Sequence, residues 1–229
     1  MLPFKPGMRA LVIGASGGIG RAIAIAFGDR VGMGGVVTLS RSADGLDVTD
    51  EGSVEAARAK LEGHFDAIFV ATGGLNVGGF GPEKTIKELS RGGFEAQFAL
   101  NAIGPGLLLK HMHDLMPRDR RAVFAILSAR VGSIGDNRLG GWTSYRAAKA
   151  AVNQIVRTSA VEIARKRPRS IVVSLHPGTV RTEMTSKYLA RHPSVLAEDA
   201  AVNLLSVIEG LTPADTGGFF DWRGEKVDW

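Results

Sequence analysis

Tyr145 and Lys149 combine an acid/base group with a cation, four positions apart in the segment Ser-Tyr-Arg-Ala-Ala-Lys. Residues i and i+4 share one face of a helix, so the ammonium can lie near the phenol. A phenol has a pKa of ~10, and bringing it near 7 takes about 4 kcal/mol in favour of the phenolate. One cation at about 4 Å supplies energy of that order at an effective dielectric of ~20. The pair predicts a tyrosine acid/base whose pKa is lowered by Lys149.

Two further polar residues are candidates for the same chemistry. Ser128 ends the apolar run Val123–Leu127, which predicts a hydroxyl at the carboxyl edge of a central strand, where open α/β sheets bind ligands. There it can hold a substrate oxygen while Tyr145 exchanges the proton. Asn101 lies inside a long helical pattern, where an amide is usually surface filler. Its neighbours are apolar, so we expect it to be buried and to need hydrogen-bond partners.

A glycine-rich loop, Gly14-Ala-Ser-Gly-Gly-Ile-Gly20, joins an apolar run to a helical pattern that starts at Arg21. The spacing alone is weak, but at a strand–helix junction the glycines permit a tight turn and the helix N-terminus offers free N–H groups to a pyrophosphate. The alternative is an ordinary glycine-rich turn. The candidate dinucleotide contacts here are Gly14, Ser16, Gly18, Ile19 and Gly20.

The end of the second apolar run indicates which dinucleotide would bind. An NAD site places an acidic residue there for the ribose hydroxyls, whereas this chain has Arg41, whose guanidinium can clamp a 2′-phosphate. NADP(H) is therefore favoured over NAD(H). The alternative is that Arg41 is a solvated loop residue and Asp44 curls back to the ribose. Asp47 and Val48 could reach the adenine, although a carboxylate at a strand end is as often a simple cap.

The cysteine, histidine and serine content of the chain does not indicate another kind of catalytic or metal site. The chain has no Cys, which excludes disulfides, thiolate metal sites and cysteine nucleophiles. His111 and His113 are two positions apart and do not share a helix face, so we expect no metal site. His176 precedes Pro177-Gly178 and could line a pocket, but a structural role is the stronger interpretation. Ser16 and Ser133 have no histidine partner at motif spacing.

Short apolar runs alternate with helical patterns along all 229 residues, without a linker or a repeat. The early runs are nearly continuous, which is typical of parallel strands covered on both faces. We therefore predict a single-domain α/β protein with one doubly wound parallel sheet of about seven strands, a Rossmann-type fold. The expected strands are Ala10–Ile13, Val36–Leu39, a very short one around Leu46–Val48, Ala67–Ala71, Ala122–Leu127, Ile171–Leu175 and Phe219–Asp221. The expected helices are Ile19–Phe27, Ser53–Glu62, Pro82–Leu89, Phe94–Met116, Ser144–Arg165 and Glu198–Glu209.

The charge and the composition indicate which classes of binding partner and which cellular location to expect. The formal net charge is +5, and the basic residues gather at Arg118–Arg121 and Arg165–Arg169, each next to an expected helix end. Cations are favourable there, and no aromatic residues interleave them, so nucleic-acid binding is not expected. The opening residues lack an apolar core of signal-peptide length, and the uncharged stretches Ala67–Pro82 and Ala96–Leu109 are broken by polar residues, Gly or Pro. We expect no membrane span and, by default, a cytoplasmic protein.

Together these residues resemble the classical short-chain dehydrogenase/reductase family over essentially the whole chain. The glycine loop is similar to its cofactor motif, and Asn101, Ser128, Tyr145 and Lys149 match its catalytic tetrad in order and approximate spacing. Its nicotinamide-side segment is matched by Pro177, Gly178, Val180 and Thr182. The segments 131–142 and 217–229 are similar to the C-factor and sniffer-like carbonyl reductase branch, as is the compressed third-strand region.

The resemblance implies further roles. Lys149 should also bind the nicotinamide ribose, and Asn101 should hold a water in a proton relay, so both join Tyr145 among the cofactor contacts. The chain departs from the family pattern at two places. The family's Asn-Asn-Ala-Gly is Ala71-Thr72-Gly73-Gly74 here, and Ile13 stands where the family has Thr. Both positions mainly support the sheet and the cofactor loop, so the departures concern local geometry more than the chemistry. Ala71, Thr72 and Gly73 remain expected cofactor contacts. The segment from Thr179 to about Pro193 should cover the substrate.

The expected activity is that of an NADP(H)-dependent oxidoreductase acting on CH–OH groups or carbonyls, with a small-molecule substrate that the sequence does not identify. By analogy with the family, the helices Phe94–Met116 and Ser144–Arg165 would pair in a homodimer or homotetramer. Two alternatives stay open: a cofactor-binding signalling or regulatory protein with little turnover, and a non-redox nucleotide-binding module.

Overall fold

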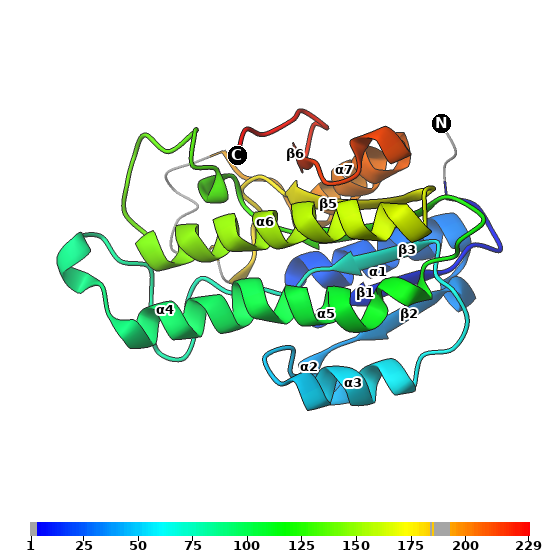
Figure 1. Cartoon of the computed structure of the whole chain (residues 1–229), viewed down its shortest axis with the longest axis horizontal. Helices are drawn as coiled ribbons and strands as arrows, with labels where there is room; N and C mark the ends of the chain where they lie inside the picture. The colour runs from blue at the N-terminus through cyan, green and yellow to red at the C-terminus, as the bar shows by residue number, and fades with distance from the viewer. Residues whose placement is uncertain (1–3, 184, 186–192) are drawn as a thin grey trace.

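The computed structural model describes residues 4–183, 185 and 193–229 (Figure 1). Parallel strands form one sheet with the order β2-β1-β3-β4-β5-β6. The chain runs outward from β1 to β2, returns past β1 to β3 and continues to β6, which is the doubly wound arrangement predicted. The strands are β1 (Ala10–Ile13), β2 (Val36–Leu39), β3 (Ala67–Val70), β4 (Ala122–Leu127), β5 (Ser170–His176) and β6 (Phe219–Asp221).

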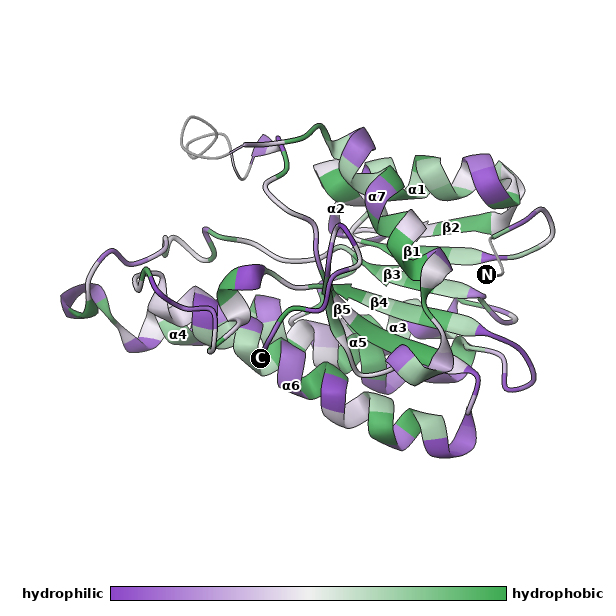
Figure 2. Cartoon of the chain, turned by 90° about the horizontal axis from the view of Figure 1, so that it is seen from above, coloured by the Kyte–Doolittle hydropathy of each residue, from purple (hydrophilic) through white to green (hydrophobic). Residues whose placement is uncertain are grey.

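Helices cover both faces of the sheet because successive strand residues are apolar on both faces. Leu11 and Ile13 join the core beneath α3 (Glu51–Ala59), α5 (Gly104–Met112) and α6 (Thr143–Lys166). Ala10 and Val12 join the opposite core, against α1 (Gly18–Val31) and α7 (Ala197–Gly210). Figure 2 shows α1 and α7 on one side of the sheet and α5 and α6 on the other.

The helical pattern predicted for Phe94–Met116 is confirmed as an unbroken helical stretch with a widened turn. It comprises α4 (Arg91–Phe98), a π-turn (Ala99–Ile103), α5 and the 3₁₀ turn His113–Leu115. Pro105 gives the reason for the wide turn, since a proline lacks an N–H and its ring clashes with the carbonyl four residues back, here that of Asn101. Gly104 N–H instead donates to the carbonyl of Ala99, five residues back. Asn101 therefore lies in a distorted part of the helix.

The predicted short strand around Leu46–Val48 is wrong. Ser40 caps a four-residue helix, α2 (Arg41–Asp44), by accepting a hydrogen bond from Ala43 N–H. The next backbone donors are also used locally, with Leu46 N–H on the Ser40 carbonyl and Asp47 N–H on Ser53 Oγ. These hydrogen bonds hold the segment away from the sheet, and β2 forms the edge of the sheet.

The helix predicted over Pro82–Leu89 is also wrong, except for one 3₁₀ turn at Ile86–Glu88. Side chains compete for its backbone donors: Thr85 Oγ1 accepts from Lys87 N–H, and the Glu88 carboxylate accepts from Lys84 N–H. Such local side-chain hydrogen bonds offer the backbone an alternative to a helix. Further 3₁₀ turns are Met33–Gly35, Arg130–Gly132 and Pro213–Asp215.

Within the part of the chain that the structure describes, no helix combines the length and the apolar character that a membrane crossing requires.

Candidate active site

The glycine loop lies between β1 and α1 at the carboxyl edge of the sheet. Gly14 has φ +89°, and a Cβ there would lie 2.9 Å from the carbonyl carbon of Ala71, so only glycine fits. A Cβ at Gly20 would collide with the carbonyl oxygen of Gly14. These close approaches fold the loop against the sheet and leave the first turn of α1, residues 18–20, facing a pocket.

Tyr145 and Lys149 lie in the first two turns of α6. The helix starts without a side-chain cap of its own, after Trp142 in the left-handed region at φ +54°. Glu83, buried in a distant loop, supplies the acceptors: its carbonyl oxygen accepts from Trp142 N–H at 2.6 Å, and its carboxylate accepts from Ser144 N–H at 3.3 Å. Glu83 thus fixes the turn that carries Tyr145.

Lys149 is buried beside the tyrosine. Its Nζ lies 5.8 Å from the centroid of the Tyr145 ring and donates to the carbonyl oxygen of Leu127 at 3.1 Å. The Trp142 ring meets the Tyr145 ring edge-on, with centroids 6.3 Å apart. The i,i+4 spacing therefore does bring the two groups together, as predicted.

The predicted lowering of the Tyr145 pKa is not found in this structure. Burial raises the pKa of Tyr145 to about 12 and lowers the pKa of Lys149 to about 8. Both shifts have one cause, because removing a group from water disfavours its charged form. In the protein alone, desolvation outweighs the attraction of the ammonium for a phenolate.

Ser128 and Asn101 differ in their hydrogen bonding. Asn101 is fully buried; its Oδ1 accepts from Gly74 N–H at 3.1 Å and its Nδ2 donates to the Gly74 carbonyl at 2.9 Å. Nδ2 also donates to Gln97 Oε1 at 2.7 Å. The buried partners expected for Asn101 are confirmed, and they hold the loop after β3. Ser128 Oγ is buried and has no partner among the described residues.

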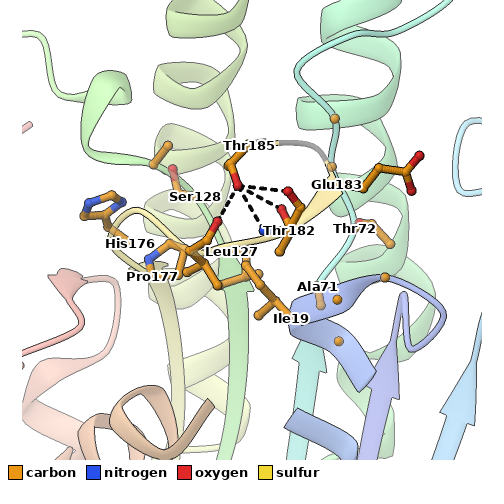
Figure 3. Close-up of a pocket in the computed structure, with 18 of the residues that line it drawn as sticks. Ile19, Ala71, Thr72, Leu127, Ser128, His176, Pro177, Thr182, Glu183 and Thr185 are labelled. Atoms are coloured by element: carbon orange, nitrogen blue, oxygen red, sulfur yellow. Dashed lines mark hydrogen bonds between the residues drawn. The ribbon is translucent and has the colours of Figure 1, made fainter. Parts of the chain in front are cut away.

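These elements surround one pocket of about 370 Å³ at the carboxyl edge of the sheet (Figure 3). Predicted site residues that line it are Ser16, Gly18, Ile19, Gly20, Ala71, Thr72, Gly73, Ser128, Tyr145, Lys149, Pro177, Gly178, Val180 and Thr182. Figure 3 shows Ser128 and His176 side by side, across from Ile19 and Ala71. The geometry brings three of the four tetrad residues and most of the glycine loop to one pocket.

Five predicted residues do not line this pocket: Gly14, Arg41, Asp47, Val48 and Asn101. Arg41 is exposed at the start of α2 and close to the glycine loop, since Gly14 N–H and Ala15 N–H both donate to the carbonyl of Leu39, two residues before it.

The acidic residues near Arg41 are engaged locally. The Asp44 carboxylate accepts from Ser40 N–H at 2.7 Å. Asp47 accepts from the hydroxyl and N–H of Thr49, and these hydrogen bonds hold its pKa below the usual value. Val48 is buried against Gly104.

The pocket is also lined by Glu183 and Thr185, which belong to the segment expected to cover the substrate, and by four residues that the sequence prediction did not name: Gly17, Gly74, Leu127 and Ala129. All four are direct neighbours of predicted residues, so extending each motif by one position would have found them. His176 also lines the pocket, which favours the interpretation that was the weaker one from sequence. The proposed substrate cover, Thr179 to Pro193, lies partly outside the described residues, which lack 184 and 186–192.

The one group of possible metal ligands found among the described residues is Glu51, Glu55 and His111, on the surface. Glu51 forms an ion pair with Lys110 and a 2.8 Å hydrogen bond with His111 Nε2, so an ammonium already neutralises it. His113 instead bonds the Leu109 carbonyl, as expected for histidines on different faces.

Comparisons with known proteins agree with this geometry. The family model described as enoyl-(acyl carrier protein) reductase matches residues 36–217. A 1-hydroxy-2-glutathionyl-2-methyl-3-butene dehydrogenase of Rhodococcus sp. (strain AD45) is 31% identical, over 96% of this chain and 98% of that protein. The C-signal protein of Myxococcus xanthus is 36% identical over 58% of this chain and 76% of its own.

Solved structures show the same fold. A short-chain dehydrogenase/reductase structure from Burkholderia multivorans with bound NADP superposes with a TM-score of 0.79 at 28% identity, over 98% of this chain and 100% of that one. An NADPH-bound carbonyl reductase from chicken fatty liver gives 0.79 at 23% identity, over 100% and 96%. The chain belongs to the short-chain dehydrogenase/reductase family, a family of nicotinamide-dependent oxidoreductases.

Proposed function

We propose that this protein is an NADPH-dependent carbonyl reductase, or the alcohol dehydrogenase of the reverse direction, with Tyr145 as the acid/base. The observation that carries the proposal is that Ser128, Tyr145 and Lys149 line the same pocket as the glycine loop. A hydroxyl buried without a partner is costly, so Ser128 Oγ at this position favours a ligand oxygen that completes it.

The residues present fit a dinucleotide. Residues 18–20 offer the N-terminus of a 14-residue helix to a pyrophosphate. Gly73, at φ +146°, leaves open a space where a Cβ would meet Asn101 Oδ1 at 3.0 Å and Lys149 Nζ at 3.3 Å. When bound, the cofactor supplies the hydride for the carbonyl carbon and, in its oxidised form, a positive charge beside the tyrosine.

The chain's own groups then have distinct tasks. Tyr145 donates its phenolic proton to the substrate oxygen as the carbonyl becomes an alcohol, and Ser128 Oγ–H holds that oxygen in place. Lys149 stabilises the phenolate left behind and holds the cofactor ribose. Asn101 fixes the loop at Gly74 and holds a relay water. Because burial alone raises the pKa of Tyr145 to about 12, the phenolate forms only when further positive charge enters the pocket.

We further propose that NADP(H) is preferred over NAD(H). Arg41 is exposed beside the glycine loop, where its guanidinium can bind a 2′-phosphate. Asp44 is engaged with Ser40, which favours a phosphate-binding role for Arg41 over a ribose-binding role for Asp44. Asp47 and Val48 would contact the adenine.

The decisive experiment measures NADPH oxidation with a panel of aldehydes, ketones and quinones, for the wild-type protein and for Tyr145→Phe. We expect Tyr145→Phe to lower kcat/KM by about 10³-fold, with NADPH still binding as judged by its fluorescence. Turnover at the wild-type rate would refute the acid/base role. Absence of NADPH binding in both proteins would refute the whole proposal.

A second candidate is a signalling or regulatory role with little turnover, which the 36% identity to the C-signal protein favours. The two differ in the same assay, because a regulatory protein binds NADPH but consumes it with no member of the panel. The presence of Tyr145, Lys149 and Ser128 in one pocket supports the reductase.

A further inference from the structure

Three buried polar atoms of residues that line the pocket have no partner among the described residues: Thr72 Oγ1, Ser128 Oγ and His176 Nδ1. Thr72 is one of the expected cofactor contacts. Ser128 Oγ belongs to the proposed reaction, whereas His176 has no task in it. A buried ring nitrogen without a hydrogen bond is unfavourable, so an atom of this kind in a residue that lines a pocket points to a ligand.

Ser128 Oγ and His176 Nδ1 belong to neighbouring residues at the ends of the adjacent strands β4 and β5. In the β4–β5 register Leu127 lies opposite Leu175, so the next positions, Ser128 and His176, are side by side. Side chains alternate between the two faces of a strand, so Ser128 lies on the same face as Ile126, and His176 on the same face as Val172. This is the face of the sheet that packs under α6. Neighbouring strands are about 4.8 Å apart, and Figure 3 shows the two side chains adjacent at the same wall.

No residue of β6 forms a hydrogen bond with His176 Nδ1. Asp221 lies opposite His176 in the β5–β6 register and is buried. Its carboxylate is already engaged, with Arg130 Nη2 at 3.1 Å, Arg223 N–H at 2.9 Å and Glu225 N–H at 3.2 Å.

The imidazole is held in its neutral form. Burial, together with Arg130 and against the opposing effect of Asp221, lowers the pKa of His176 to about 4. It can therefore donate or accept a hydrogen bond according to its tautomer, and it does not act as a cation near neutral pH.

We propose that His176 recognises a second oxygen of the substrate, on the carbon next to the reacting carbonyl. A carbonyl oxygen has two lone pairs, and Tyr145 and Ser128 fill both, so the reacting oxygen cannot also serve His176. The strand spacing of about 4.8 Å and hydrogen bonds of ~2.9 Å fit two oxygens on neighbouring carbons. The substrate class is that of α-hydroxy ketones, 1,2-diketones and the corresponding vicinal alcohols. The inference rests on the proposed reductase function.

The experiment compares three ketones on one carbon skeleton, 2-butanone, 3-hydroxy-2-butanone and 2,3-butanedione, each with NADPH. The quantity of interest is the ratio of kcat/KM for each oxygenated ketone to that for 2-butanone. Differences in intrinsic reactivity cancel when this ratio is compared between variants. His176→Leu removes the ring nitrogens at similar volume, and His176→Asn keeps a polar atom near the place of Nδ1. His113→Leu removes a histidine that does not line the pocket.

We expect His176→Leu to lower both ratios by about tenfold, as for one lost hydrogen bond of about 1.4 kcal/mol. His176→Asn should restore at least half of that loss on a logarithmic scale, and His113→Leu should leave the ratios at their wild-type values. Equal ratios in wild type and His176→Leu would overturn the inference while leaving the reductase intact. So would a wild type that reduces other carbonyls but neither oxygenated ketone. A wild type that neither binds nor oxidises NADPH would instead overturn the proposed function.

Discussion

The two edges of the sheet differ in how completely their buried polar groups are hydrogen-bonded. At the amino edge, Asp66 accepts from Arg120 Nε at 2.7 Å and from Arg9 N–H at 3.0 Å. Arg167, also buried, donates to the carbonyls of Met116 and Asp114. At the carboxyl edge, the pocket contains buried side-chain atoms of Thr72, Ser128 and His176 for which the described residues provide no partner.

The presence or absence of a hydrogen-bond partner distinguishes buried polar residues that stabilise the fold from those that are positioned to bind a ligand. A buried polar group that is hydrogen-bonded contributes to stability, whereas one without a partner is unfavourable until a ligand binds. The lowered pKa of Lys149 has the same meaning, since the protein alone holds that ammonium in a site that disfavours its charge. Substitutions at the carboxyl edge should therefore affect activity more than stability, and those at the amino edge the reverse.

The largest expected effect is that of Lys149→Met. We expect kcat/KM to fall by roughly 10³-fold, because the phenolate of Tyr145 loses its cation. The thermal midpoint of the cofactor-free protein should rise by about 3 °C, because a desolvated charge is replaced by an apolar chain. Activity assays and thermal melts of the same preparations provide the measurement.

The pH dependence of that gain in stability supplies the control. The pKa of Lys149 falls from 10.5 to about 8 on folding, so between these values the unfolded chain binds a proton that the folded chain does not. Wild-type stability from this group therefore rises with pH over that window, and the advantage of Lys149→Met should shrink from pH 8 to pH 10.5. A lower midpoint for Lys149→Met at pH 7 would contradict the comparison.

Asp66→Ala tests the amino edge, with the next largest effect. It leaves Arg9 N–H without its side-chain acceptor and breaks the ion pair with Arg120, which should cost about 2 kcal/mol and lower the thermal midpoint by about 6 °C. Values of kcat/KM should stay within twofold of wild type. Asp119→Ala is the matched control, because Asp119 contacts the same Arg120 at 3.7 Å but is 83% exposed. A large loss of activity in Asp66→Ala with an unchanged midpoint would reverse the assignment of the two edges.

Much of the fold could be predicted because periodicity is a local property. The run Ala122–Leu127 became β4 without change, and the pattern Ser144–Arg165 became α6 to within one residue at each end. The errors lie where side chains capture backbone donors, as Ser40 and Thr85 do. Hydropathy does not reveal such hydrogen bonds, so a strand and a helix were expected where turns exist.

The candidate site divides in the same way. The spacing of Tyr145 and Lys149, and the place of Ser128 after its strand, were enough to bring them into one pocket. The direction in which the pKa of Tyr145 shifts could not be predicted, because it depends on burial by segments distant in sequence. The importance of His176 was also hidden, since its free nitrogen depends on Asp221 being engaged with Arg130, 91 positions away in the chain.

Arg41→Asp tests the comparison at an exposed position of the carboxyl edge, because it reverses a charge without changing the buried part of the protein. A carboxylate repels a 2′-phosphate and can accept from a ribose hydroxyl, so the NADPH/NADH ratio of kcat/KM should fall at least about tenfold. Arg41 is exposed, so the thermal midpoint should change by less than about 2 °C. Arg91→Asp, at a residue whose side chain is 91% exposed and outside the pocket, is the matched control for charge. An unchanged ratio in Arg41→Asp would refute the phosphate-binding role.

The smallest expected effect concerns stability at mildly acidic pH. The pKa of His176 falls from 6.5 to about 4 on folding, through burial and Arg130 and despite Asp221. Between these values the unfolded chain takes up a proton that the folded chain refuses, so this group lowers stability as pH falls from about 6.5 towards 4. Relative to His176→Leu, wild type should lose about 1 kcal/mol of unfolding free energy between pH 7 and pH 5.5, measured by urea denaturation. If the two denaturation midpoints instead keep a constant difference across that range, the imidazole is charged or solvated in the folded protein. The carboxyl edge would then hold one fewer desolvated group than the comparison requires.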